Sequence, residues 1–143
     1  IGELEKMYSI KLPSIFCEYL CSYFYYFNEI EGVLDNFCGE NDKKIIVYLF
    51  SIPKENPLSQ LKKMLEDFSE LVDSGYVPIG DLYGWGPICF DTLDNNRIIW
   101  FDHDEYYNYD TREELEDIGE ILFENFYEFM KCFFCGEKHI CNM

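Results

Sequence analysis

The chain has 143 residues, of which 48% are hydrophobic, and a formal net charge of -17 at pH 7. This length suits one domain with a core of its own, and the hydrophobic content excludes a disordered polyanion. The acidic balance argues against binding nucleic acid or an anionic membrane, whose phosphates attract Lys and Arg, and it favours a basic partner. Acidity also keeps an aromatic-rich protein in solution, so charge alone identifies no partner.

The first half of the chain carries two helix patterns followed by strand patterns. Residues 1–7 have the spacing of a short helix, and Pro13 opens a second one. The apolar residues of that second helix recur at helical steps: Ile15, Phe16, Tyr19, Leu20, Tyr23, Phe24 and Phe27. We expect a strand near Val33 and Leu34. The continuous apolar run 44–50 predicts a central strand buried on both faces.

Residues 56–75 carry the clearest helix pattern of the chain. Asn56 is a good cap, Pro57 suits the first turn and Gly75 ends the pattern. Its apolar residues follow at three- and four-residue steps: Leu58, Leu61, Met64, Leu65, Phe68, Leu71 and Val72.

Residues 76–104 predict two or three consecutive strands. The runs 88–93 and 97–101 are rich in β-branched and aromatic residues, and the intervening Asp94, Asn95 and Asn96 tolerate the left-handed positions of a tight turn. The glycines before this hairpin suit a tight loop, because no helix start follows them as a dinucleotide site requires.

The last third of the chain predicts two helical segments. Residues 111–120 favour a helical turn or two, and Asn125 caps a final helix with Glu128 three residues later, as in a capping box. The inner face of that helix comprises Phe126, Phe129, Met130, Phe133 and Phe134. Taken together, the patterns predict an α+β fold in a single domain, residues 1–143, with a mainly antiparallel sheet flanked by helices.

Two clusters offer chemistry that the residue types permit. His103 stands between Asp102 and Asp104, and such a histidine can bind a metal or act as a general base. His139 is the only other histidine, so we interpret the cluster as a strand end with solvated acids. The second cluster has ligand types that zinc prefers: Cys132, Cys135, His139 and Cys141.

The spacing of the second cluster is tighter than in a usual zinc knuckle. Its alternatives are a redox pair of Cys132 and Cys135, or reduced thiols on a helix and its tail. The chain has seven cysteines and no secretory signal, which favours free thiols and a cytoplasmic protein. No run approaches the length of a membrane span. We expect no cofactor and no catalytic site.

An acidic, tyrosine-rich stretch follows His103. Between Asp102 and Glu128 eleven acidic residues stand against the single Arg112. Tyrosine gives rigid contact area at low entropic cost, and it is enriched at interfaces. The stretch is either a solvated face or a docking surface for a basic protein. The candidate partner-binding residues are Asp102, Asp104, Glu105, Tyr106, Tyr107, Tyr109, Asp110, Glu113 and Glu114.

Three blocks spanning nearly the whole chain match one family pattern in the right order. The first block comprises Glu5, Leu12, Pro13, Phe16, Tyr19 and Leu20. The second comprises Val77, Pro78, Ile79, Gly80, Gly84, Gly86, Ile88, Asp91, Ile99, Trp100, Asp102 and His103. The third is the run LFENFYEFM at 122–130. With these blocks the chain resembles the SUKH superfamily, which includes fungal cell-wall (glucan) synthesis regulators and bacterial immunity proteins of polymorphic toxin systems.

The chain departs from this family pattern at two places. Residues 22–26 replace the usual Asn-Gly-Gly, and Pro87 stands where the family has an acid. The resemblance implies an α+β domain that works by binding another protein, without known catalysis.

We therefore expect a non-enzymatic protein-binding domain, most concretely an immunity-type protein that neutralises a nuclease-like toxin through its acidic surface. The alternative is a regulatory adaptor similar to the glucan-synthesis regulators. A third possibility is a zinc-binding module built on the C-terminal cysteine and histidine cluster. A gene for a large secreted toxin beside this gene favours immunity, whereas envelope or kinase genes favour the adaptor.

Overall fold

The computed structural model describes residues 29–49, 62–63 and 65–142, together with Lys6, Lys11 and Ser14. The helices predicted over 1–7 and after Pro13, and the helix start predicted at Asn56, lie outside the described residues. Among the described residues, no helix has the length and apolar composition needed to cross a lipid bilayer.

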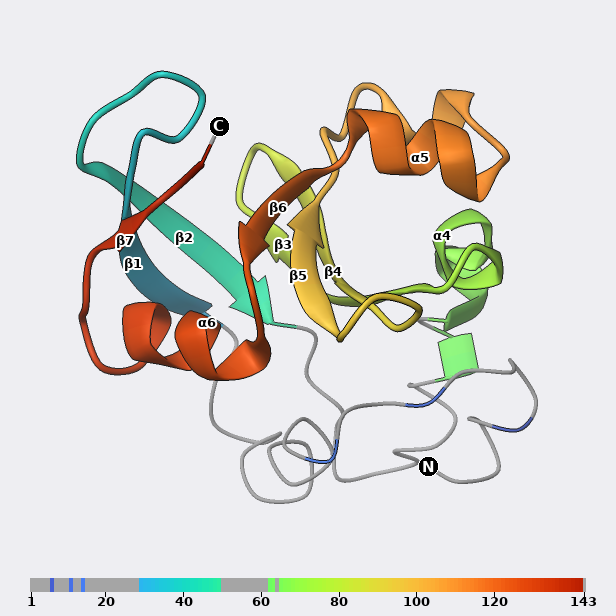
Figure 1. Ribbon diagram of the computed structural model, residues 1–143, viewed down its shortest axis with the longest axis horizontal. Coiled ribbons are helices and arrows are strands. Elements are labelled where there is room, and N and C mark those ends of the chain that lie inside the picture. The colour runs from blue at the N-terminus through green and yellow to red at the C-terminus, as the bar shows by residue number, and fades with distance from the viewer. Residues whose placement is uncertain are drawn as a thin grey trace.

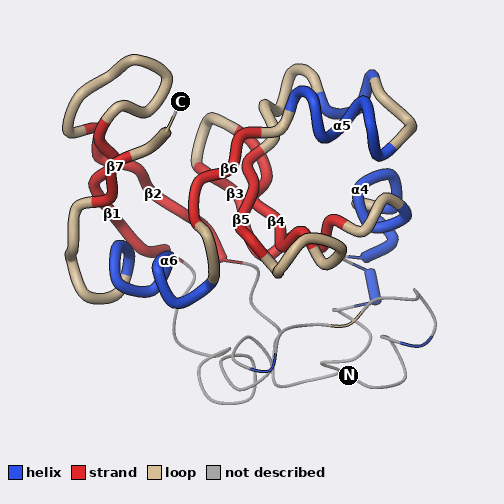
Figure 2. Tube along the Cα trace, viewed as in Figure 1, coloured by secondary structure: helices blue, strands red, loops and turns tan. Residues whose placement is uncertain are grey.

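A seven-stranded sheet organises the described part of the chain (Figures 1 and 2). Its strands are β1 (Glu29–Asp35), β2 (Lys43–Leu49), β3 (Tyr76–Leu82), β4 (Gly86–Asp91), β5 (Arg97–Trp100), β6 (Glu120–Phe123) and β7 (His139–Ile140). They lie in the order β6-β5-β4-β3-β2-β1-β7. Neighbours are antiparallel except β1 and β7, which are parallel. The predicted α+β class with a mainly antiparallel sheet is confirmed.

Helices cover the sheet from two sides. They are α4 (Ser69–Asp73), the 3-10 helix η1 (Tyr106–Asn108), α5 (Arg112–Ile118) and α6 (Phe126–Phe133). Figure 1 shows α5 and α6 on opposite sides of the central strands. Asn125 caps α6 as predicted, because its side chain accepts a hydrogen bond from the Glu128 backbone N–H at 2.9 Å.

Strands β3, β4 and β5 are buried on both faces because alternate side chains point into two separate clusters. In β5, Ile98 and Trp100 join the cluster that contains the phenylalanines of α6. Ile99 lies between them in sequence and joins the other cluster, which contains Leu115 of α5 and Leu71 of α4. One face of the sheet therefore packs against α5 and against the loop before it.

The β4–β5 hairpin confirms the predicted turn chemistry. Asn95 and Asn96 adopt the left-handed conformation with φ of 55° and 54°. At the other end of β4, Gly86 has φ of 131°, and a Cβ there would lie 2.2 Å from the Phe101 carbonyl oxygen and 2.6 Å from the His103 backbone nitrogen. Only glycine lets the β3–β4 turn approach the segment after β5 this closely.

Three features of the sheet differ from the sequence prediction. β2 is central, but only one of its faces is buried: Ile45 and Val47 are inaccessible, whereas Tyr48 is 36% exposed. The edge strands β6 and β7 were not predicted. β6 is four residues long and β7 two, so neither has enough alternating positions to signal a strand.

Candidate functional site

The acidic surface comprises the nine candidate residues between Asp102 and Glu114, and the structure places them on one continuous segment between β5 and the first turn of α5. Asp104, Glu105, Asp110, Glu113 and Glu114 are exposed, and Asp102 is half-buried. The prediction that these carboxylates lie at the surface is confirmed.

Local hydrogen bonds shape the start of this segment. The Asp102 carboxylate accepts a hydrogen bond from the Asp104 backbone N–H at 2.8 Å, and the Asp102 carbonyl accepts from the N–H groups of Glu105 and Tyr106. Aspartate favours such turns because its short side chain reaches the backbone two residues later. Asp102 therefore shapes the turn, and Asp104 and Glu105 extend from it into solvent.

The three tyrosines of the surface have different roles. Tyr106 and Tyr109 are half-buried and pack against the cluster beneath α5. Tyr107 is 58% exposed, with its ring edge-on to Tyr106 at a centroid distance of 5.9 Å. Of the three rings, Tyr107 offers a partner the most contact area.

The first turn of α5 carries acids that suit a helix start. The Thr111 side chain accepts a hydrogen bond from the Glu114 backbone N–H at 3.3 Å and donates one to the Glu114 carboxylate at 3.0 Å. Glu113 and Glu114 also interact favourably with the positive end of the helix dipole. Glu113 remains directed to solvent, whereas Glu114 takes part in the cap.

Beneath the acidic surface lies a buried carboxylate that sequence analysis missed as an ion-pair centre. Asp91 is fully buried at the end of β4. Arg112 of α5 donates to both of its oxygens, at 2.9 and 3.1 Å, and Arg97 of β5 donates to one at 3.2 Å. A third bond from Arg112, 2.9 Å long, reaches the Ser74 carbonyl after α4. Arg112 thus links α5 to the sheet through Asp91 and to the end of α4 through Ser74.

Tyr76 forms the wall against which Arg112 packs. The guanidinium lies 4.8 Å from the centroid of the Tyr76 ring, a cation–π contact. Burial raises the pKa of Tyr76 to about 12, although the nearby Arg112 opposes this rise. Burial lowers the pKa of Arg112, but its bond to Asp91 and the surrounding groups more than offset this effect and raise it. Arg112 is therefore a fixed cation turned inward.

The sequence did contain a signal for this arrangement. Arg97 and Arg112 are the only arginines of the chain. Arginine is preferred over lysine for desolvated, multidentate pairing with a carboxylate. Asp91 is the single aspartate at the end of an otherwise apolar strand, and both arginines follow it closely in the sequence. This pattern indicates a buried ion pair.

This arrangement leaves neither arginine of the chain free to compensate the acidic surface. Arg97 is held by Asp91, and also by Asp94 at 3.2 Å and Glu116 at 3.3 Å. Several lysines pair elsewhere, in β2, α6 and the C-terminal segment: Lys43 with Glu40, Lys44 with Glu31, Lys131 with Glu128 and Lys138 with Asp42. Arg112, which lies within the segment from Asp102 to Glu114, is thus directed into the fold, whereas Asp104, Glu105, Asp110 and Glu113 are exposed.

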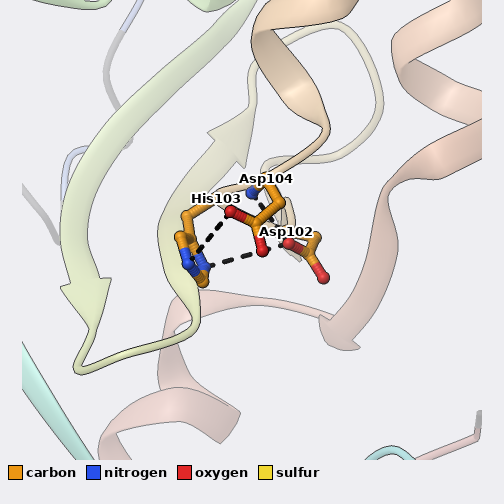
Figure 3. A group of neighbouring side chains, drawn as sticks. All are labelled: Asp102, His103 and Asp104. Atoms are coloured by element: carbon orange, nitrogen blue, oxygen red, sulfur yellow. Dashed lines mark hydrogen bonds and ion pairs between the residues drawn. The ribbon is translucent and has the colours of Figure 1, made fainter.

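His103 stands between Asp102 and Asp104 at the start of the acidic surface, and Figure 3 shows its ring beside their carboxylates. Its Nε2 lies 3.4 Å from a carboxylate oxygen of Asp104, and its Nδ1 lies 3.8 Å from one of Asp102. In the described part of the chain, this is the only group of three or more potential ligand atoms that lie within 4.8 Å of one another. The imidazole is 53% exposed, which fits the interpretation as a strand end with solvated acids.

The C-terminal cysteine and histidine cluster does not converge on one point. Cys135 is exposed, whereas Cys132 and Cys141 are buried. The Nε2 of His139 bonds to the Leu122 carbonyl, and its ring packs on Phe123 with a centroid distance of 4.2 Å and an interplanar angle of 34°. This geometry does not support the zinc alternative. His139 instead joins β7 to β6, the two edges of the curled sheet.

Comparison of the chain with protein-family models, with curated proteins and with solved structures finds no match. The resemblance to the SUKH superfamily therefore rests on the three blocks of residues alone.

Proposed function

We propose that the chain is a non-enzymatic protein-binding domain that captures a basic protein through its acidic surface. Most concretely, it is an immunity-type protein that neutralises a nuclease-like toxin. One observation carries the proposal: four acids of the segment, Asp104, Glu105, Asp110 and Glu113, are exposed. Both arginines of the chain, in contrast, are bound to the buried Asp91.

A nuclease toxin suits this surface because its own active site must attract phosphates. Such a site is lined with Lys and Arg, and a fixed array of carboxylates can occupy it in place of a nucleic-acid backbone. Opposite charge also speeds encounter, by about 10- to 1,000-fold at low salt. The exposed ring of Tyr107 supplies the apolar contact that charge alone lacks.

The resemblance to immunity proteins of the SUKH superfamily supports the same proposal from the sequence. Those relatives act by binding a toxin. Because this chain has a net charge of -17 and exposed acids, we expect its toxin to be a basic protein.

The test measures binding to a purified basic nuclease toxin domain, with charge-matched variants; a toxin gene beside this gene would supply that domain, and the absence of one would count against immunity. The site variant is Glu105→Gln with Glu113→Gln, and the control is Glu29→Gln with Glu137→Gln; all four positions are exposed. The control residues lie in β1 and next to β7, far from α5 in Figure 1. Isothermal titration is run at about 50 and about 500 mM salt, where the screening length falls from roughly 14 to roughly 4 Å.

We expect the site variant to bind about 2- to 30-fold more weakly, since each exposed pair contributes about 0.2–1 kcal/mol. The control should bind like the wild type. Tyr107→Ala should weaken binding by about fivefold or more, with little salt dependence. Equal loss in the site variant and the control would show that only total charge matters, and binding that is insensitive to both would exclude this surface.

A further inference from the structure

His103 is held by the β3–β4 turn through two hydrogen bonds to one atom. Its backbone N–H donates to the Trp85 carbonyl oxygen at 3.0 Å, and its Nδ1 lies 3.0 Å from the same oxygen. A carbonyl oxygen only accepts, so Nδ1 carries a hydrogen in both protonation states of the ring. The proton that titrates is therefore the one on Nε2.

Nε2 is directed at the acidic surface. It lies 3.4 Å from the Asp104 carboxylate, as the dashed line in Figure 3 marks. The other carboxylates that act on the ring are Asp102 on its own segment and Asp81 on β3. When Nε2 is protonated, it holds Asp104 in an ion pair. When Nε2 is neutral, its lone pair faces the carboxylate, and Asp104 is released.

We propose that His103 competes with the cationic side chains of a partner for Asp104, so that the acidic surface binds more tightly as the pH rises through neutrality. This inference rests on the proposed function, because it describes how that surface is regulated. The competitor is built into the fold: Gly86 brings the turn that carries Trp85 against the backbone of His103.

The groups around the ring together raise the pKa of His103. The bond to Trp85 raises the pKa of His103 above its ordinary value of 6.5, partial desolvation lowers it, and Asp104, Asp102 and Asp81 raise it further. For a group with a raised pKa in the folded state, the charged contacts are fully present below pH 6.5. They are lost as the pH rises through the raised value. Free carboxylates and lysines do not titrate in this window.

The first experiment tests the ion pair without any partner. The chain has two histidines, so NMR titration of the imidazole carbons resolves His103 from His139, which serves as an internal reference. We expect the His103 midpoint to lie above 6.5 and to fall in Asp104→Asn. A midpoint at or below 6.5, or one unchanged in Asp104→Asn, would overturn the competition.

The second experiment measures binding of a fluorescent oligolysine peptide at constant ionic strength between about pH 5.5 and pH 8, a range in which lysine stays charged. Wild-type affinity should rise about threefold, the effect of one unit charge roughly 6 Å away in a water-like dielectric. His103→Gln should remove this pH dependence, and His139→Gln should preserve it.

The outcomes separate the two proposals. An identical pH dependence in His103→Gln and the wild type would overturn the regulation by His103 and leave the acidic surface as the binding site. Absence of peptide binding at every pH would overturn the proposed function, and this regulation with it.

Discussion

Replacing Asp91 with asparagine is the most direct test of what fixes the acidic surface in place. The substitution preserves shape but turns one carboxylate oxygen into an amide nitrogen. Each oxygen of Asp91 accepts at least two hydrogen bonds: Oδ1 from Arg112 and the Leu93 backbone, and Oδ2 from Arg112 and Arg97. In either orientation, therefore, the new NH2 group faces donors, and two guanidinium groups lose their buried counter-charge.

The size of the effect follows from the burial of the partners. Removing one partner of a buried ion pair costs about 3–5 kcal/mol. The side chains of Arg97 and Arg112 are 18% and 25% exposed, so water can reach them, and we expect the lower end, about 3 kcal/mol. For a domain of this size, that corresponds to a fall in Tm of about 6–12 °C.

Urea denaturation followed by tryptophan fluorescence and by circular dichroism measures this loss. The matched control is Asp94→Asn, which removes the same formal charge. Asp94 is 45% exposed and meets Arg97 at 3.2 Å, so its loss should cost no more than about 1 kcal/mol. If Asp91→Asn is no less stable than Asp94→Asn, the buried pair does not anchor α5 and the reasoning is wrong.

Two further predictions concern other parts of the fold. A strained φ alone costs about 1–3 kcal/mol. Gly86→Ala should destabilise the protein by more than this, because its Cβ would also clash with the backbone after β5. Gly84→Ala, with nothing within 4 Å of its Cβ, should cost only the strain, and equal urea midpoints for the two would contradict this. Alkylation at about pH 8 should label the exposed Cys135 before the buried Cys132 and Cys141, which should react only after unfolding, since burial raises the pKa of both thiols to about 11. Mass spectrometry of the labelled peptides checks the order, and native labelling of Cys132 as fast as that of Cys135 would exclude it.

Local signals allowed the sequence to predict the β4–β5 hairpin and the cap of α6. Asn95 and Asn96 adopt the left-handed turn because their own side chains tolerate it, and Asn125 caps α6 through an atom three residues away. These outcomes depend on short stretches of chain. The class of the fold followed from the same signals, since helix and strand patterns alternate without the regular repeat of a parallel sheet.

Long-range contacts account for what the sequence did not predict. β6 exists because Ile121 pairs with Ile99, and β7 because His139 pairs with Leu34, about a hundred residues away. Tyr106 and Tyr109 were expected on the surface with Tyr107, but the cluster beneath α5 draws them inward. A tyrosine in an acidic stretch looks the same in sequence whether its ring supports the fold or faces solvent.

The buried ion pair also fixes the position of the first acids of α5. Asp91 holds Arg112 at the first residue of α5, and the exposed Glu113 follows it directly. If the surface works through fixed carboxylates, Asp91→Asn should weaken partner binding at a temperature where it remains folded, because α5 is loosened. Asp94→Asn makes the same change in net charge without loosening α5, and it should bind like the wild type. An equal loss of binding in both variants would mean that the partner responds to the total charge of the domain rather than to the positions of its acids. Wild-type binding by both variants would mean that the position of α5 does not matter to the partner.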